Sequence, residues 1–262
     1  MAKAVPLFSG SSGNSYYIGS SGEGVLIDAG RSCKQLENML ANNSIDIKSI
    51  GAVFITHEHI DHCQGVRVFA KRYGLKIYAS QGTLQAMEEK NLVNADNSCE
   101  VIEDSVEIGN MRILRCDTPH DARESCCYQV TTADGRKAVV ATDMGVMTEP
   151  VRELIRNSDF AVVESNHDVN MLKNGMYPPY TKARILSDRG HLSNDACAAE
   201  IADFVRCGNF RLMLGHLSEH NNIPELALNT SLSALEGCGM KRNLDFTLSV
   251  VPRESDGKSI IF

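Results

Sequence analysis

The sequence of 262 residues contains no tryptophan and lacks any long apolar run. No stretch approaches the roughly twenty apolar residues that a membrane-spanning helix needs. The amino-terminal segment also lacks the apolar core of a signal peptide. From these absences we expect a cytoplasmic protein that neither spans a membrane nor is exported.

The sequence also lacks any pair of cysteines separated by two residues, although it has nine cysteines at irregular spacings. Without an export signal, an odd number of cysteines indicates reduced thiols and not a disulfide framework. Cys63 is expected to be a small buried apolar residue and not a metal ligand. Cys126 and Cys127 fall in a predicted strand, where neighbouring side chains point to opposite faces, so a disulfide between them is not expected.

The sequence has fewer basic than acidic residues, 26 against 33, so its formal net charge is −7. Proteins that bind nucleic acid usually carry a basic face, so this balance weakens that function class. It does not exclude it, since two bound divalent cations would offset four of the negative charges inside the cleft. The length fits one domain over residues 1–262 or two fused halves, and the apolar content of 43% is ordinary for a globular protein.

Alternating and periodic apolar patterns predict a chain of strands and helices. Strands are expected at 5–8, 16–18, 25–27, 51–55, 76–79, 99–116, 126–132, 137–142, 159–163, 210–214, 246–250 and 259–262. Helices are expected at 32–43, around 66–70, after Ser80 or Thr83, near 148, and at 194–206 and 224–236. Ser32 and Ser193 are expected to cap the helices at 32–43 and 194–206. This alternation is typical of an α/β protein.

Four potential metal ligands, His57, His59, Asp61 and His62, lie within six residues after the predicted strand at 51–55. In an extended chain, side chains two residues apart point to the same side, so His57, His59 and Asp61 can converge. His62 is expected to turn away with the first helical turn and to serve a second ion. Imidazole and carboxylate ligands suit zinc, manganese or iron.

Further candidate site residues follow other predicted strands. His120 is flanked by Asp117 and Asp121, and a carboxylate often orients a ligand imidazole through its second nitrogen. Asp143 either binds a metal, caps the helix near residue 148 or closes a turn. Glu164 ends a buried strand, and the residues that cap the next helix are expected to be Asn166 or Asp168, which follow it.

Two segments have both a functional and a plain structural interpretation. The loop at 9–15, with Ser11, Ser12 and Asn14, either presents backbone N–H groups and hydroxyls to a phosphate or forms a hairpin turn. The segment 170–190 is the most basic aromatic stretch. It either grips a phosphate backbone and stacks bases or is a solvated connection.

The motif His57-x-His59-x-Asp61-His62 resembles the signature of the metallo-β-lactamase superfamily of metallohydrolases. The segments at 117–121, 141–145 and 212–218 resemble its later motifs in the expected order. Together with the glycine- and serine-rich loop at 9–15, the chain is most similar to the YycJ family (also called VicX or WalJ) of bacterial metallohydrolases. This resemblance implies an α/β fold, the four-layer αββα sandwich with two mixed sheets and helices outside.

The resemblance also implies two divalent metal ions, either zinc or manganese, with iron as a further candidate. It assigns His57, His59 and His120 to one ion and Asp61, His62 and His216 to the other, with Asp143 bridging them. Asp28 is expected to support the metal loop without binding metal. Related oxygen-reducing members carry glutamate at the position of His59, so a redox role is not expected.

Glu164 and His191 match the pair that helps protonate the leaving group in the related tRNA 3′-processing endonucleases. With Asp61 orienting a hydroxide activated by both metals, the resemblance implies a phosphodiesterase acting on nucleic acid, and specifically an exonuclease working from a 5′ end of DNA. No large RNA-binding arm is visible, which disfavours tRNA. The expected substrate contacts are Ser11, Ser12, Asn14, His167, Lys182, Arg184, His220 and Asn222.

Two alternative functions remain open from the sequence. The same metals could hydrolyse small esters, lactones or thioesters. A regulatory or scaffolding protein could instead keep a metal site only for stability, although the complete ligand set and the acid candidate argue against this.

Overall fold

The computed structural model describes residues 1–208 and 211–262. The chain forms two compact units. The first contains residues 1–117, 122–138 and 252–262, and the second contains residues 118–121 and 139–251. No helix in the described ranges is both long and apolar enough to cross a membrane. The expectation of one domain over the whole chain stays a prediction.

The first unit contains a seven-stranded mixed sheet in the order β14-β1-β2-β3-β4-β5-β6. Strands β1 to β3 pair antiparallel and β3 to β6 pair parallel. The carboxyl ends of β3, β4 and β5 therefore meet at one edge, where Asp28 follows β3 and His57 follows β4. The strands are β1 Lys3–Phe8, β2 Ser15–Ser20, β3 Glu23–Ile27, β4 Ile50–Phe54, β5 Lys76–Ala79, β6 Cys99–Val101 and β14 Ile260–Ile261.

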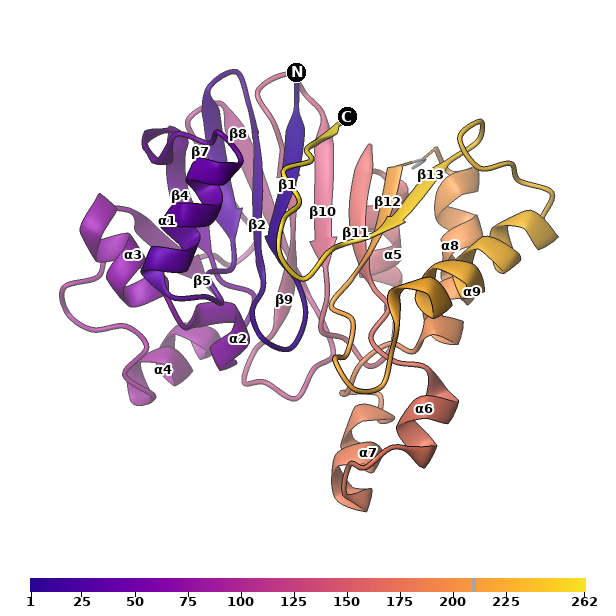
Figure 1. Ribbon diagram of the computed structural model, residues 1–262. Helices are drawn as coiled ribbons and strands as arrows, with labels where there is room; N and C mark the ends of the chain where they lie inside the picture. Colours follow the sequence, from indigo (N-terminus) through magenta and orange to yellow (C-terminus); the bar gives the residue numbers. More distant parts are fainter. Residues whose placement is uncertain (209–210) are drawn as a thin grey trace. The chain divides into compact units, whose positions relative to one another are not determined.

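Helices of the first unit cover this sheet with their apolar faces. Leu36 and Leu40 of one helix and Phe69 of another join Val53 and Ile77 of the sheet in a single buried cluster. Periodic apolar positions thus determine which face of each helix is buried. The helices are α1 Cys33–Asn42, α2 Ile60–Cys63, α3 Val66–Tyr73 and α4 Gln81–Glu89, with a short 3₁₀ turn at Ile47–Ser49 (Figure 1).

Three antiparallel strands of the first unit, β7 Ser105–Ile108, β8 Met111–Asp117 and β9 Cys126–Thr131, form a meander. This meander packs on the first sheet. The rings of Phe54 on β4 and Tyr128 on β9 lie 5.4 Å apart edge to face, and the Tyr128 hydroxyl donates to the Ile55 carbonyl at 2.9 Å. Two sheets therefore face each other within this unit.

The second unit is built from parallel strands and helices. Its strands β11 Phe160–Glu164, β12 Arg211–Gly215 and β13 Thr247–Val250 pair parallel. Strand β10 Lys137–Ala141 lies beside β11, so the strands of this unit have the order β13-β12-β11-β10. The helices are α5 Glu149–Arg156, α6 Val169–Asn174, α7 Pro179–Ile185, α8 Asn194–Arg206 and α9 Pro224–Gly237. Two mixed sheets with helices confirm the predicted α/β class.

Helix caps agree with the sequence. Ser32, Ser80 and Ser193 each accept a hydrogen bond from the backbone N–H three residues later. The strand predicted at 210–214 is observed from Arg211, and Phe210 lies outside the described residues. All nine cysteines are free, and Cys63 is buried, as expected.

Candidate functional site

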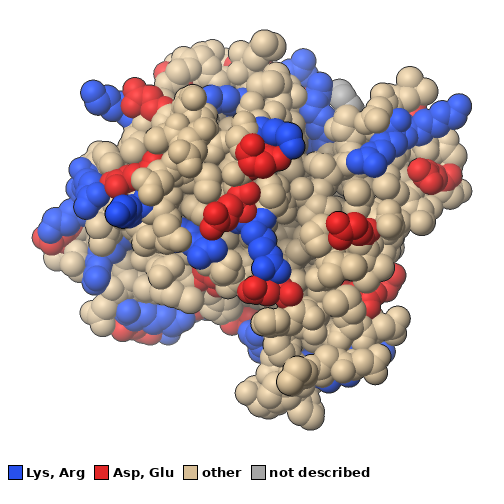
Figure 2. Space-filling view, in the orientation of Figure 1, with Lys and Arg blue, Asp and Glu red and all other residues tan. Residues whose placement is uncertain are grey.

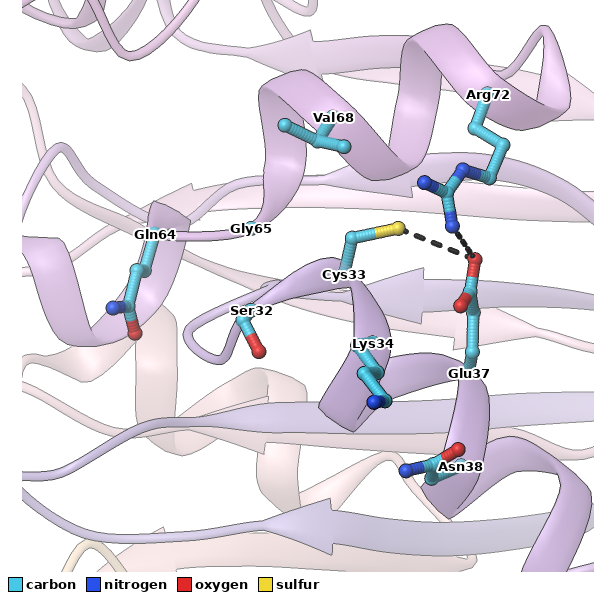
Figure 3. A pocket seen from close by; sticks show the side chains of 9 residues that line it. All are labelled: Ser32, Cys33, Lys34, Glu37, Asn38, Gln64, Gly65, Val68 and Arg72. Carbon is cyan, nitrogen blue, oxygen red and sulfur yellow. Dashed lines mark hydrogen bonds and ion pairs between the residues drawn. The ribbon is translucent and has the colours of Figure 1, made fainter.

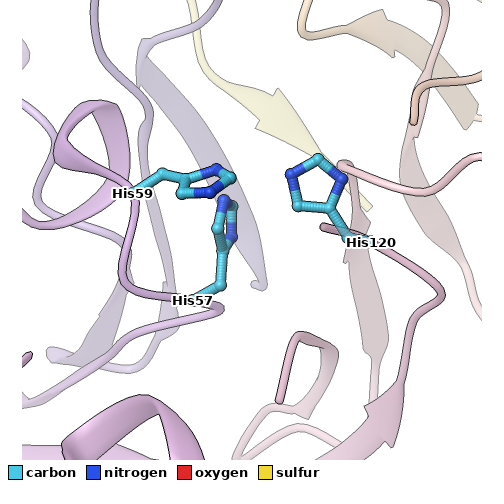
Figure 4. A group of neighbouring side chains, drawn as sticks. All are labelled: His57, His59 and His120. Atoms are coloured by element: carbon cyan, nitrogen blue, oxygen red, sulfur yellow. The ribbon is translucent and has the colours of Figure 1, made fainter. Parts of the chain in front are cut away.

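The histidine loop of the first unit follows β4. The rings of His57 and His59 lie 4.5 Å apart at an angle of 79° between their planes (Figure 4), and Figure 4 also draws His120, which belongs to the second unit. The expectation that His62 turns away is wrong, because its ring lies 4.1 Å from that of His57. Helix α2 begins at Ile60, so its first turn carries His62 back beside the loop.

Asp28 fixes the orientation of His62. Its fully buried carboxylate accepts hydrogen bonds from the backbone N–H of Thr56 at 2.8 Å and from the Thr56 hydroxyl at 3.0 Å. It also bonds Nδ1 of His62 at 2.8 Å. Burial raises the pKa of Asp28, and the neighbouring His62 opposes this rise. With its Nδ1 proton directed at a carboxylate, an imidazole presents Nε2 to a metal.

Asn14 connects the loop at 9–15 to the histidine loop. Its backbone N–H donates to the Asp61 carbonyl at 2.7 Å, and its side-chain nitrogen lies 3.1 Å from Nε2 of His62. The segment is a turn between the antiparallel strands β1 and β2, so the hairpin interpretation is confirmed. Ser11 and Ser12 are exposed at its tip, and Arg31 donates to the Ser12 hydroxyl at 2.9 Å.

Glu164 is the centre of the second unit's polar cluster. It ends β11 and is completely buried. One carboxylate oxygen, Oε1, accepts from Nδ1 of His191 at 2.8 Å and from Nδ1 of His216 at 2.9 Å. The other, Oε2, accepts from the backbone N–H groups of Met144 and Leu192 at 2.9 and 3.1 Å. Burial alone would raise the pKa of Glu164, but the charges and hydrogen bonds of the two histidines outweigh it and hold that pKa well below its usual range.

Asp143 lies beside these histidines. Its Oδ1 is 3.3 Å from Nδ1 of His216 and 3.7 Å from Nδ1 of His191. Asp143 and His216 both have left-handed backbone angles, with φ of 61° and 54°, which are uncommon outside glycine and concentrate at functional sites. Ligand atoms from Asp143, Glu164, His191 and His216 lie within 4.8 Å of one another. Helix α5 is capped at Thr148, so Asp143 is not its cap.

His120 is buried and held through its backbone and its ring. Its Nδ1 donates to the carbonyl of Gly190 at 3.0 Å, and the guanidinium of Arg189 donates to the carbonyl of His120 at 2.8 and 3.0 Å. Its ring lies 4.9 Å from that of His191. Burial lowers the pKa of His120, which favours the neutral ring that a metal ligand requires.

The two carboxylates that flank His120 in the sequence, Asp117 and Asp121, make different contacts. Asp117 accepts a hydrogen bond from Arg115 at 2.6 Å, and the Gly190 carbonyl takes the position at Nδ1 that a carboxylate was expected to fill. Asp121 lies 3.2 Å from Nε2 of His120 and also pairs with Arg184 at 2.6 Å. A flanking carboxylate, that of Asp121, therefore lies at one ring nitrogen of His120, and a backbone carbonyl lies at the other.

The remaining predicted substrate contacts differ in exposure. His167 is 1% exposed, and neither ring nitrogen has a hydrogen-bond partner in the described part of the chain. Burial lowers its pKa to about 4. His220 is exposed, with its ring 5.9 Å from that of Tyr177. Lys182 donates to the Lys173 carbonyl at 2.8 Å.

A network of asparagines, which the sequence did not reveal, supports the second unit's loops. Asn222 donates to the carbonyls of Ser165 and Asn166 at 2.9 and 3.0 Å. Asn166 in turn donates to the carbonyl of His216 at 2.8 Å. Of the two predicted caps of α6, Asp168 fills the role and Asn166 does not. No local pattern distinguishes the two, since both are polar residues after a strand.

A surface pocket of about 590 Å³ lies between α1 and α3 (Figure 3). Glu37 in its wall pairs with Arg72 at 2.6 Å and accepts from the Cys33 thiol at 3.4 Å. Burial raises the pKa of Cys33 to about 11, so the thiol is not an activated nucleophile. None of the lining residues is one of the predicted ligands, and the pocket is not the candidate site.

Comparison with known proteins identifies relatives over most of the chain. Residues 24–217 match the β-lactamase superfamily domain family. The chain is 38% identical to exodeoxyribonuclease WalJ of Streptococcus pneumoniae over 92% of this chain and 90% of the relative. It is 35% identical to exodeoxyribonuclease YycJ of Bacillus anthracis over 89% of each chain. The metallo-β-lactamase fold protein YhfI of Bacillus subtilis superposes with a TM-score of 0.70 at 16% identity, over 97% of this chain and 98% of that one. This match confirms the predicted fold.

Proposed function

Because the chain belongs to the β-lactamase superfamily and, within it, to the family of WalJ and YycJ, we propose that it is a metal-dependent exonuclease that shortens DNA from a 5′ end. The names of both relatives support DNA as the substrate. A DNA substrate also agrees with the cytoplasmic location expected from the sequence.

The proposed cofactor is a pair of divalent cations, and the donor groups of each unit fit it. The first unit offers buried imidazoles, with His62 held through Nδ1 by Asp28. The second offers Asp143 together with His216, which is held through Nδ1 by Glu164. Such pairing fixes the tautomer that presents Nε2 as a ligand. Nitrogen and oxygen donors of this kind suit zinc or manganese, with iron as a further candidate.

The proposed ligands follow the family motif. One ion is assigned to His57, His59 and His120 and the other to Asp61, His62 and His216, with Asp143 shared. When bound, divalent cations lower the pKa of water and offset the negative charge of phosphate oxygens. The proposed role of Asp61 is to orient the attacking water.

The observation that carries the proposal is the contact between Glu164 and His191. Cleaving a phosphodiester between nucleotides releases a sugar alkoxide, a poor leaving group that needs a proton. Glu164 accepts from Nδ1 of His191 and orients the ring, which leaves Nε2 free of this contact. Nε2 of His191 can then donate its proton to the leaving oxygen as the phosphorus–oxygen bond breaks, and the ring remains neutral and hydrogen-bonded to Glu164.

Leaving groups of different quality test this role. His191→Ala is expected to slow cleavage of DNA about 100-fold or more, since general acid catalysis contributes on the order of 10²–10⁴. It should slow hydrolysis of bis(p-nitrophenyl) phosphate much less, because nitrophenolate leaves without a proton. An equal loss on both substrates would contradict the acid role.

Asp143→Ala tests the metal assignment. This variant is expected to lose hydrolysis of both substrates while circular dichroism shows the fold retained. Measuring bound metal by atomic emission in the same samples shows whether the shared ligand is lost. Full activity in the variant would overturn the metal assignment.

A further inference from the structure

Helices α6 and α7 form a hairpin that projects from the rest of the second unit (Figure 1). In the sequence, this hairpin separates Glu164 from His191, the two residues of the proposed acid pair. The chain therefore enters the hairpin after one residue of the proposed site and leaves it before another.

Specific contacts tie the hairpin to that site. Arg184, at the end of α7, pairs with Asp121 at 2.6 Å, next to His120. Arg189, just after α7, donates to the carbonyl of His120. In the turn between α6 and α7, the ring of Tyr177 lies 5.9 Å edge to face from that of His220. A ligand held by the hairpin would thus be positioned relative to these loops.

The hairpin exposes large apolar side chains. Met176 is 101% exposed, the fully accessible value, and Tyr180 is 77% exposed. Exposed apolar groups that cluster on one feature mark interaction sites more often than single ones do. Pro178 and Pro179 lie between them and restrict the backbone, which reduces the entropy lost when a ligand binds.

The charge of the hairpin is opposite to that of the chain. Residues 169–189 contain Lys173, Lys182, Arg184 and Arg189 but only one acidic residue, Asp188, whereas the whole chain has a net charge of −7. On the face shown in Figure 2, the surface over α6 and α7 is mostly uncharged, with Lys and Arg at its margins. An exposed aromatic ring bordered by cations matches a ligand with stacking rings and a negative backbone, which is single-stranded nucleic acid.

We propose that the α6–α7 hairpin docks the single-stranded part of the DNA substrate. Tyr180 stacks on an unpaired base, Met176 packs beside it, and Lys182 meets a backbone phosphate. This inference rests on the proposed nuclease function and adds the contact that selects an unpaired strand.

Because the chain has no tryptophan, Tyr180→Trp creates a single fluorescent reporter on the hairpin. The metal-loaded variant is titrated with a phosphorothioate-linked thymidine oligonucleotide that resists cleavage. We expect saturable quenching of emission that weakens as salt is added. The matched control is Leu244→Trp, which replaces another exposed apolar residue of the second unit (75% exposed) and should give no quenching.

Kinetics give a second readout. Tyr180→Ala is expected to raise KM for single-stranded DNA about tenfold, because the variant loses the stacking of an aromatic ring on a base. Its loss on bis(p-nitrophenyl) phosphate, which lacks bases, should be much smaller. Tyr180→Phe should restore most of the DNA affinity, and Leu244→Ala should behave like the wild type.

The outcomes separate the two proposals. Quenching without any DNA cleavage by the wild type would support the docking surface and contradict the nuclease. Cleavage without quenching of Tyr180→Trp would overturn the docking surface alone. A change in sedimentation of Tyr180→Ala with unchanged DNA affinity would assign the hairpin to contact between copies of the chain, and would also overturn it.

Discussion

Asp28 in the first unit and Glu164 in the second are both fully buried carboxylates that hold imidazoles through Nδ1. Asp28 holds one ring, His62, which belongs to a cluster already formed by the local sequence. Glu164 holds His191 and His216, which are 27 and 52 residues away from it. The first unit therefore supports a local motif, whereas the second assembles its cluster around one side chain.

The pKa values of Asp28 and Glu164 also differ between the two units. Burial raises the pKa of Asp28 despite its single histidine, whereas two histidines hold the pKa of Glu164 well below its usual range in spite of its burial. Since several loops of the second unit meet at Glu164, its removal should cost more than removal of Asp28. The predictions below test this ranking.

The largest effect is expected from Glu164→Gln. Glutamine has one acceptor oxygen and no charge, so it cannot accept both from the two histidines and from the backbone N–H groups that bond Oε2 of Glu164. Both the acid function of His191 and the orientation of His216 should therefore suffer. Cleavage of end-labelled DNA should fall about 10²–10⁴-fold. Glu153→Gln, on the exposed side of α5, is the control and should be silent. A loss of less than tenfold in Glu164→Gln would break the comparison.

Asp28→Asn should have a smaller effect that excess metal can reverse. Loss of a carboxylate behind a ligand histidine typically weakens metal binding about 10–100-fold. Titrating activity against added zinc or manganese should therefore shift the midpoint and leave the plateau nearly unchanged. If no metal concentration restored activity, Asp28 would be as central as Glu164.

Asn222→Ala should lower the free energy of unfolding and have little effect on the rate of DNA cleavage. Its amide donates to two buried carbonyls, and leaving such groups unpaired costs about 1–3 kcal/mol. Urea denaturation of the variant measures this cost. Asn174→Ala removes an exposed amide bonded to the Asn170 carbonyl and provides the matched control, which should change stability far less. An equal loss of stability in the two variants would show that the asparagine network contributes no more than an exposed hydrogen bond.

The smallest effect concerns His167, which neither carboxylate holds. Burial lowers its pKa to about 4, so below pH 6.5 the unfolded chain binds a proton that the folded chain does not. The free energy of unfolding should consequently fall by about 1 kcal/mol between pH 6.5 and 5.5 because of this group. The slope should be shallower in His167→Phe, and an unchanged slope would contradict a buried neutral ring.

The same contrast explains what the sequence could predict. The cluster from His57 to His62 is local, so spacing alone indicated a metal site. The expected direction of His62 was wrong, because the foreseen helical turn brings its ring beside that of His57. Caps such as Ser32 and Ser193 are also local and were correct. The contact between His120 and the Gly190 carbonyl joins residues 70 positions apart, which no local pattern encodes. The pairing of Glu164 with His191 was predicted only through family resemblance, which carries such long-range information.

The most direct test of the central claim is cleavage of single- and double-stranded DNA and RNA labelled at either end, with zinc or manganese and with a chelator as control. We predict metal-dependent shortening of DNA from the 5′ end and none with chelator. Failure to cleave any of these polymers, with metal bound at two sites, would contradict the nuclease and favour a hydrolase of small esters, lactones or thioesters.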